Sequence, residues 1–355
     1  MKLTRILTFA FVVAALTGGI YVALPQTVRP HPKESHLRNI RQLTFGGENA
    51  EAYFSFDGQK VIFQSTRDSY KCDQILTMNR DGSNARLVST GKGRTTCGYF
   101  TPDGKRIIYA STHLGSPDCP PPADRAEGYV WAIYRTFDIF SAKTDGTDLK
   151  RLTTTDGYDA EGTIAPDGKK IVFTSARDGD LDIYDMNLDG TQQRRLTNEL
   201  GYDGGAWHSQ DSQWIVWRAS RPKTPEEVAR YKELFAKNLV MPIKMELMIM
   251  RADGSNKRQL TSNGAANFAP YFHPNGRQII FASNVNNPNP RSANFDLYLI
   301  TRDGTGLQQV TFDEGFDGFP MFTGDGKRLI WGSNRNGKTE GETNVFIADW
   351  VDTGV

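Results

Sequence analysis

A short turn phrase recurs along almost the whole of this 355-residue chain. In its clearest copy, Ala165-Pro166-Asp167-Gly168, proline presets the backbone, aspartate bonds its own backbone and glycine accepts positive φ. Because apolar runs flank the phrase, it predicts a tight turn between two strands. The six copies lie at 55–58, 101–104, 165–168, 209–212, 273–276 and 323–326. Such a regular recurrence predicts a repeat architecture.

Each repeat has apolar runs and turns for four short antiparallel strands, which is the pattern of a propeller blade. A Leu-Thr phrase closes the repeats, and its first copy, Leu43-Thr44, precedes the first blade. The last repeat ends at its third strand, near 345–350. We therefore expect an all-β, six-bladed β-propeller. Its N-terminal strand, about 40–44, would complete the last blade and remove an open sheet edge.

Two repeats are longer than the others. Asp57 and Asp103 are 46 residues apart, whereas Asp103 and Asp167 are 64 apart. The additional residues form two inserts, at 113–135 and 221–243, both between the second and third strands of a blade. In the second insert, Thr224 as N-cap and Pro225 at the first helical position predict a helix over 225–236. Its apolar stripe is expected to pack on the propeller rim; the stripe is Val228, Tyr231 and Phe235.

The N-terminus predicts export. Lys2 and Arg5 precede an apolar run at 6–24, the pattern of a signal peptide or of an uncleaved membrane anchor. We expect a leader or anchor at 1–24, a linker at 25–36 and the propeller at 37–355, in the periplasm or secreted. The 42 basic and 41 acidic residues give a net charge of +1 without a basic stripe, which disfavours nucleic-acid binding.

Three cysteines are expected on the face that carries the long loops, where blades 1 and 2 adjoin. They are Cys72, Cys97 and Cys119. In an exported protein this number predicts one disulfide and one remaining thiol. Either Cys72–Cys119 or Cys97–Cys119 would pin the insert of blade 2, and the sequence does not rank the two pairings.

Several of these phrases together resemble a known family. The repeats are similar to those of TolB-type six-bladed β-propellers. The phrases that carry this resemblance are Leu-Thr, Pro-Asp-Gly-Lys, the loop Ser175-Ala176-Arg177-Asp178-Gly179, Ile-Tyr and a closing Asp-Gly-Thr. TolB itself is a periplasmic protein of the Tol–Pal envelope system with an α/β domain ahead of its propeller, which has no counterpart at 25–36. The resemblance implies the fold, export and the binding of partners on one face.

In each repeat, the residue eight positions before the Asp or Asn of the turn is polar. These six residues, here called the first ring, are expected around the mouth of the central channel. The position two residues after each of them adds further acids. The residues expected to bind a partner or ligand there are Asn49, Glu51, Thr95, Asp159, Glu161, Asp203, Asn267 and Asp317. Few counter-charges are evident, so the mouth suits a cationic partner segment or Ca²⁺. The alternative is that these residues cap strand starts by local hydrogen bonds.

The residue three positions before the Asp or Asn of each turn is expected to pack between neighbouring blades. This position holds Phe54, Phe100, Ile164, His208, Phe272 and Phe322, so His208 is interpreted as a structural histidine. Arg67-Asp68 and Arg177-Asp178 are expected to lock their loops as ion pairs.

Two functions remain open at this stage. The first is a monomeric, non-catalytic module that binds a protein or peptide of the cell envelope through its long-loop face and acidic mouth. The second is a hydrolase or lyase acting on a polysaccharide or peptide, with channel carboxylates such as Asp159, Glu161, Asp203 and Asp317 as general acid and base. A pocket sized for a sugar would favour the enzyme, and exposed apolar patches on the inserts would favour the binder.

Overall fold

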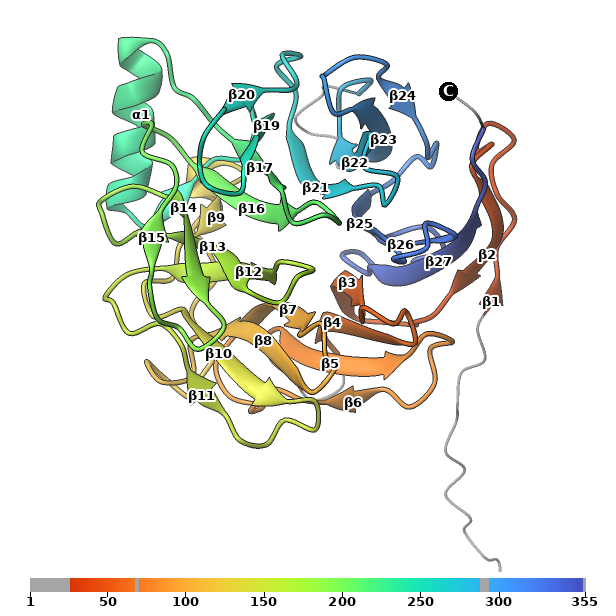
Figure 1. The fold of residues 1–355 in the computed structure, drawn as a ribbon, viewed down its shortest axis with the longest axis horizontal. Coiled ribbons are helices and arrows are strands. Elements are labelled where there is room, and N and C mark those ends of the chain that lie inside the picture. Colours follow the sequence, from red (N-terminus) through yellow and green to blue (C-terminus); the bar gives the residue numbers. More distant parts are fainter. Residues whose placement is uncertain (1–25, 68–69, 288–293, 354–355) are drawn as a thin grey trace, which may run out of the picture.

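Six small antiparallel sheets surround a central axis in the computed structural model, which describes residues 26–67, 70–287 and 294–353 (Figure 1). Each sheet is a blade whose first strand lies innermost. The six-bladed β-propeller expected from the sequence is therefore confirmed. Within the described residues no helix is long and apolar enough to cross a bilayer, and the run 6–24 lies outside them.

The first three blades follow one another in the chain. Blade 1 comprises β3 (Glu48–Phe54), β4 (Lys60–Thr66), β5 (Gln74–Asn79) and β6 (Arg86–Leu87). Blade 2 comprises β7 (Thr95–Phe100), β8 (Arg106–Ser111), β10 (Asp138–Lys143) and β11 (Lys150–Arg151). Blade 3 comprises β12 (Asp159–Ile164), β13 (Lys170–Ser175), β14 (Asp182–Asn187) and β15 (Arg194–Arg195).

The second half repeats this plan until the last blade. Blade 4 comprises β16 (Asp203–His208), β17 (Trp214–Ala219), β19 (Glu246–Arg251) and β20 (Arg258–Gln259). Blade 5 comprises β21 (Asn267–Phe272), β22 (Gln278–Ser283), β23 (Asp296–Thr301) and β24 (Gln308–Gln309). Blade 6 comprises β25 (Asp317–Phe322), β26 (Arg328–Ser333), β27 (Asn344–Trp350), β2 (Leu37–Gln42) and β1 (Gln26–Thr27).

The ring is closed by pairing between the two ends of the described chain. Strand β2 lies antiparallel to β27, with Leu37 opposite Trp350 and Gln42 opposite Phe346. This confirms that an N-terminal strand completes the last blade. The segment expected as a linker is packed rather than free. Strand β1 adds a fifth strand beyond β2, and Glu34 is buried with its carboxylate 3.0 Å from Arg335.

The repeated turns form as their residue types predict. In the turn after β12, Gly168 takes a φ of +71°, and Asp167 accepts a hydrogen bond from the Lys169 N–H at 3.0 Å. Elsewhere a hydroxyl at the first turn position also donates to the aspartate, as Ser55 does to Asp57 at 2.6 Å. These local bonds fix each hairpin, and the interblade position packs as expected, with all six of its residues buried.

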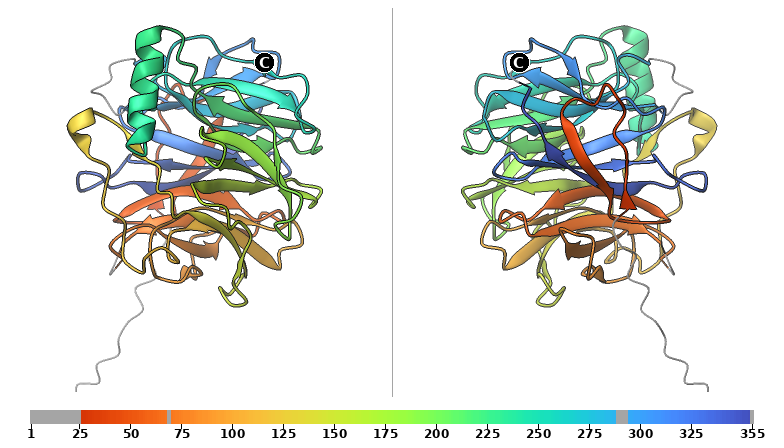
Figure 2. Two further views of the ribbon diagram at one scale, coloured as in Figure 1. Left: turned by 90° about the vertical axis from the view of Figure 1, so that its left-hand side faces the viewer. Right: turned by 90° about the vertical axis from the view of Figure 1, so that its right-hand side faces the viewer.

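The two inserts form one layer on a single face of the disc (Figure 2). The blade 4 insert contains α1 (Pro225–Ala236), which begins at Thr224 with both bonds of a capping box. It also contains β18 (Leu239–Val240), which pairs with β9 (Trp131–Ala132) of the blade 2 insert. A 3₁₀ turn, η1 (Arg125–Glu127), precedes β9. The sequence predicted the helix but not this pairing.

Two of the three residues of the helix stripe pack on the propeller as expected, and one further helix residue is buried. Tyr231 and Phe235 contact the hydrophobic core of the propeller, and Tyr231 donates a hydrogen bond to Asp180 in blade 3. Leu234, which lies beside this stripe, is buried with Val130 and Leu239 in a small core shared by the two inserts. The inserts therefore contact both the rim and each other.

Candidate functional site

Each innermost strand carries a β-bulge at the same place, next to the central channel. The bulged residue takes a left-handed backbone conformation in every blade: Glu51, Cys97, Glu161, Gly205, Ala269 and Phe319, with φ between +48° (Ala269) and +61° (Gly205). For a residue other than glycine this conformation costs about 1–2 kcal/mol, and such strain gathers at functional sites. The bulges bring all six residues to the wall of one cavity.

This cavity lies in the channel and has a volume of about 30 Å³. Tyr99 and Trp207, whose rings meet edge to face at 5.0 Å between centroids, line it and also line a second cavity of about 20 Å³ further along the channel. The rings of Tyr53 and Tyr271 contact Trp207 at 4.8 and 5.1 Å. An aromatic partition therefore separates the two cavities, and the channel is not an open pore.

Glu51 is a carboxyl group of the cavity wall with an incomplete set of hydrogen bonds. Its Oε2 atom is buried and has no hydrogen-bond partner. Burial raises the pKa of Glu51 from 4.5 to about 7; a hydrogen bond with the Cys97 thiol lowers it and the charge of Glu161 raises it. A carboxyl group with such a pKa changes its protonation near neutral pH.

Glu161, which lines the same cavity, has both a charged partner and several hydrogen-bond donors. Its carboxylate pairs with the buried Arg218 and accepts hydrogen bonds from the Tyr202 hydroxyl at 2.9 Å and the Thr174 hydroxyl at 2.7 Å. The backbone N–H of Gly205 also donates to it at 2.9 Å. Glu161 and Arg218 therefore neutralise each other.

The insert layer covers part of this pair. The ring of Trp131, on β9, lies 5.2 Å from the Arg218 guanidinium, which also lies 5.2 Å from the Tyr202 ring. Sequence reasoning did not identify Arg218 or Trp131 as site residues. Trp131 lies in an insert, and the position of Arg218 in the second strand holds a different residue type in the other blades, so the repeat pattern held no signal for them.

The first ring is buried rather than exposed at the mouth. Its members are at most 1% exposed: Asn49, Thr95, Asp159, Asp203, Asn267 and Asp317. The amides bond the loop backbone, as Asn267 does to the Met245 carbonyl at 2.8 Å. Burial raises the pKa of Asp159 above its usual range and that of Asp203 to about 7.

The three aspartates of this ring have arginine partners, contrary to the expectation of few counter-charges. The nitrogen–oxygen distances are 3.0 Å for Arg177–Asp159, 2.6 Å for Arg221–Asp203 and 2.7 Å for Arg335–Asp317. Arg177 therefore pairs with Asp159 and not with Asp178, which accepts a hydrogen bond from Tyr184. The proposed role of the ring in binding stays a prediction, and its hydrogen bonds match the strand-capping alternative.

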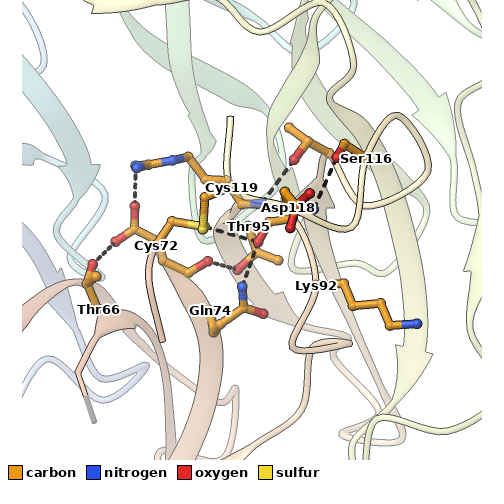
Figure 3. Close-up of a disulfide and its surroundings, with 12 residues drawn as sticks. Thr66, Cys72, Gln74, Lys92, Thr95, Ser116, Asp118 and Cys119 are labelled. Atoms are coloured by element: carbon orange, nitrogen blue, oxygen red, sulfur yellow. Dashed lines mark hydrogen bonds and ion pairs between the residues drawn. A yellow bond between two sulfur atoms is a disulfide. The ribbon is translucent and has the colours of Figure 1, made fainter. Parts of the chain in front are cut away.

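The cysteines divide between two places. Cys72 and Cys119 form a disulfide that joins the loop before β5 to the blade 2 insert (Figure 3). Gln74 and Arg94 add hydrogen bonds nearby, to the Gly93 carbonyl at 2.7 Å and to Asp73 at 2.6 Å. Cys97 is free and lines the cavity, where burial raises the pKa of its thiol well above 9. A thiol in this state is a poor nucleophile.

Two further sequence interpretations concern chemistry. His208 is buried between blades, and burial lowers its pKa to about 4, which fits a structural histidine. Across the described part of the chain, no three His, Cys, Asp or Glu residues are grouped so as to hold a metal ion. Ca²⁺ at the mouth remains a prediction from the ring of oxygen ligands.

Comparisons with known proteins agree on the fold. No protein-family model matches the chain. A TolB homolog of Chlorobium luteolum is 26% identical over 145 residues, which are 34% of this chain and 33% of that protein. The matched segment thus spans about a third of the curated relative.

Solved structures resemble the chain over most of its length. A putative TolB from Agrobacterium tumefaciens superimposes with a TM-score of 0.55 at 17% identity, over 86% of this chain and 91% of that one. A gluconolactonase from Xanthomonas campestris superimposes with a TM-score of 0.57 at 12% identity, over 92% of this chain and 95% of that one. An oligogalacturonate lyase from Vibrio parahaemolyticus has a TM-score of 0.53 at 13% identity, over 92% of this chain and 96% of that one. The chain is a TolB-like six-bladed β-propeller, and the gluconolactonase and the lyase share its fold.

Proposed function

We propose that this chain is an exported propeller that binds a protein or peptide of the cell envelope on its long-loop face. The placement of exposed apolar side chains carries the proposal. Five large hydrophobic residues are exposed in the described segments, and four lie on this face: Leu114 (57%), Tyr129 (63%), Leu200 (39%) and Ile243 (44%). Exposed apolar side chains gathered on one face are typical of an interaction surface.

The same face is built to be rigid. The Cys72–Cys119 disulfide anchors one insert to blade 1, and the β9–β18 pairing joins it to the other. Glu127 of η1 forms ion pairs with Arg230 and Lys237 of the helix insert, at 2.7 and 2.6 Å. Because these contacts order the loops before any partner arrives, binding would lose little conformational entropy.

Export supports an envelope partner, as does the likeness to a TolB homolog. The leader pattern at 1–24 lies outside the described residues, so export rests on Lys2, Arg5 and the apolar run alone. We expect the propeller to act as a monomer. Its own β2 pairs with β27, so this edge of the last blade is not available to a second copy.

An enzyme is the second candidate, and Glu51 is the observation that favours it. A carboxyl group with a pKa of about 7 is suited to general acid–base chemistry near neutral pH. The cavity of about 30 Å³ beside it, however, has room for water-sized groups and not for a sugar ring. Turnover of oligosaccharides or lactones that is lost in Glu51→Gln would establish this candidate instead.

The binding proposal is tested by capture from an envelope extract of the source organism. The bait is the purified protein, compared with the triple variant Leu114→Ser/Tyr129→Ser/Ile243→Ser. Leu307→Ser is the matched control, because Leu307 is 46% exposed but lies in the β23–β24 turn on the opposite face. A protein retained by wild type and by the control but lost with the triple variant supports the proposal. Equal retention by all three baits contradicts it.

A further inference from the structure

Glu51 differs from the other acidic groups around it because it has no cationic partner. Glu161 pairs with Arg218 in the cavity wall, and the nearby Asp73 pairs with Arg94 at 2.6 Å. Among the described residues, no Lys, Arg or His lies within ion-pair distance of Glu51, and Arg218 is committed to Glu161. One negative charge at the cavity wall is therefore uncompensated whenever Glu51 is ionised.

The carboxyl group of Glu51 also has a vacant hydrogen-bonding position. The Cys97 thiol bonds to it, and Oε2 is buried without a partner. A thiol is a weak donor, and a buried acceptor without a donor is costly. The cavity thus offers one buried acceptor that a donor group of a ligand can satisfy.

The dimensions and walls of the cavity limit what that ligand can be. A cavity of about 30 Å³ has room for one or two water-sized groups. A planar guanidinium or a quaternary ammonium needs more room than a primary ammonium. Aromatic rings of Tyr53, Tyr99, Trp207 and Phe319 complete the wall. Such rings attract a cation to their faces and contact an alkyl chain well.

We propose that this cavity binds one primary ammonium group, carried on a lysine side chain of the bound protein or peptide. The inference rests on the proposed function and specifies its partner. The ammonium enters from the long-loop face and donates to the free oxygen of Glu51. The ammonium fills this water-sized cavity, and the lysine methylenes and the peptide chain stay outside it, toward the insert layer.

Binding of this kind is linked to protonation. The charged and titratable groups that face Glu51 are Tyr53 on its own strand, Cys97 on β7, Glu161 on β12, Arg218 on β17, and Asp73 in the loop before β5. With its pKa near 7, Glu51 is largely protonated at pH 6 and must release that proton to accept an ammonium. Affinity for lysine should therefore be full above pH 7 and fall by up to about tenfold per pH unit below it.

The test uses calorimetric titration of the purified protein with three blocked peptides that differ only in a central residue: lysine, Nε-acetyl-lysine or arginine. n-Butylammonium is a fourth probe, which distinguishes a free amine from a peptide-borne lysine. The variants are Glu51→Gln, an uncharged isostere of the protonated carboxyl, and Asp253→Asn, a control in the exposed β19–β20 turn on the opposite face. Thermal unfolding at pH 6 confirms that both variants fold.

We expect the lysine peptide to bind at pH 8 at least tenfold more tightly than the acetylated or arginine peptides. Glu51→Gln should lose that preference and the pH dependence, whereas Asp253→Asn should keep both. Competition by n-butylammonium would show that the ammonium alone suffices, and lack of competition would assign the site to peptide-borne lysine.

Equal binding of the acetylated peptide, unchanged binding by Glu51→Gln, or no saturable binding of any probe would overturn the inference. The proposed function is tested separately. A partner that is lost with the triple insert variant but retained by Glu51→Gln would leave the binding face in place and refute only the lysine site.

Discussion

The guanidinium of Arg177 lies 3.0 Å from the carboxylate of Asp159, eighteen residues before it in the chain. The same spacing joins Arg221 to Asp203 and Arg335 to Asp317. In each case the aspartate begins the innermost strand and the arginine follows the second strand, so the pair ties the two ends of one hairpin together. In blade 5 the two positions hold Asn267 and Val285, and no charge is present at either.

This internal comparison predicts how the pair contributes to stability. Arg177→Val alone leaves the buried carboxylate of Asp159 without its partner, which should lower the free energy of unfolding by about 3–5 kcal/mol. The double change Asp159→Asn/Arg177→Val reproduces the blade 5 residues and should restore most of that loss. Ser175 stands opposite Asp159 as Ser283 stands opposite Asn267, where it donates to the amide oxygen at 2.7 Å. Denaturant unfolding of the two variants checks this, and a double variant as unstable as the single one would contradict it.

The disulfide is expected to stabilise the blade 2 insert in particular. Replacing Cys72 and Cys119 by serine removes a link between residues 47 apart and should cost about 2–4 kcal/mol. Limited proteolysis should then cut first within 113–135. Cys97→Ser is the control, because that thiol is free and its replacement should leave the cleavage pattern unchanged. Identical patterns for both variants would show that the insert is held by its other contacts.

Stability should decrease as pH rises from about 5 to 8. Burial raises the pKa values of Glu51, Asp203 and Asp296 to about 7, so the folded state binds protons that the unfolded state has already lost. The contribution of each group is complete below its unfolded pKa near 4 and is lost as pH passes 7.

Glu51→Gln isolates one of these three groups. The variant should be more stable than wild type at pH 8, on the order of 1–3 kcal/mol, and about equal to it at pH 5. Thermal unfolding at the two pH values measures this difference. A variant less stable than wild type at pH 8 would mean that ionised Glu51 has a stabilising partner.

The insert layer should unfold separately from the propeller. Leu234 is 2% exposed in the small core that it forms with Val130 and Leu239. Leu234→Ala should cost about 2–4 kcal/mol within that layer. Hydrogen exchange should accelerate in α1 and β18 but not in strands such as β13, and the melting temperature of the propeller should change little. Faster exchange throughout would show that the layer and the blades unfold together.

The sequence predicted the fold well because the fold depends on local chemistry. The Asp-Gly turns and Thr224-Pro225 at the start of α1 each act within a few residues. The Leu-Thr phrase before the first blade indicated the closing strand by its place among the repeats. The pairing of β9 with β18 was missed since two-residue strands in irregular inserts show no periodicity.

The site was harder to predict for a physical reason. Of the six left-handed bulge residues only Gly205 is a glycine, so the usual sequence signal for positive φ is absent at Glu51, Cys97 and Phe319. The pairing of Arg177 with Asp159 was missed although its eighteen-residue spacing recurs. The next residue, Asp178, is also acidic, so the sequence suggested it as the partner of Arg177. Arg218 lies at a position that other blades fill differently.

The closure of the ring has a consequence for how the protein is made. Gln42 leaves the ribosome long before Phe346, the residue opposite it in blade 6. Five blades can form from contiguous sequence, but the sixth must wait for the last strand. Until then β2 has no partner on one side, and contacts between distant segments form slowly. The chain therefore stays incompletely folded during synthesis, and the proposed export would need a polypeptide that crosses a membrane before it becomes rigid.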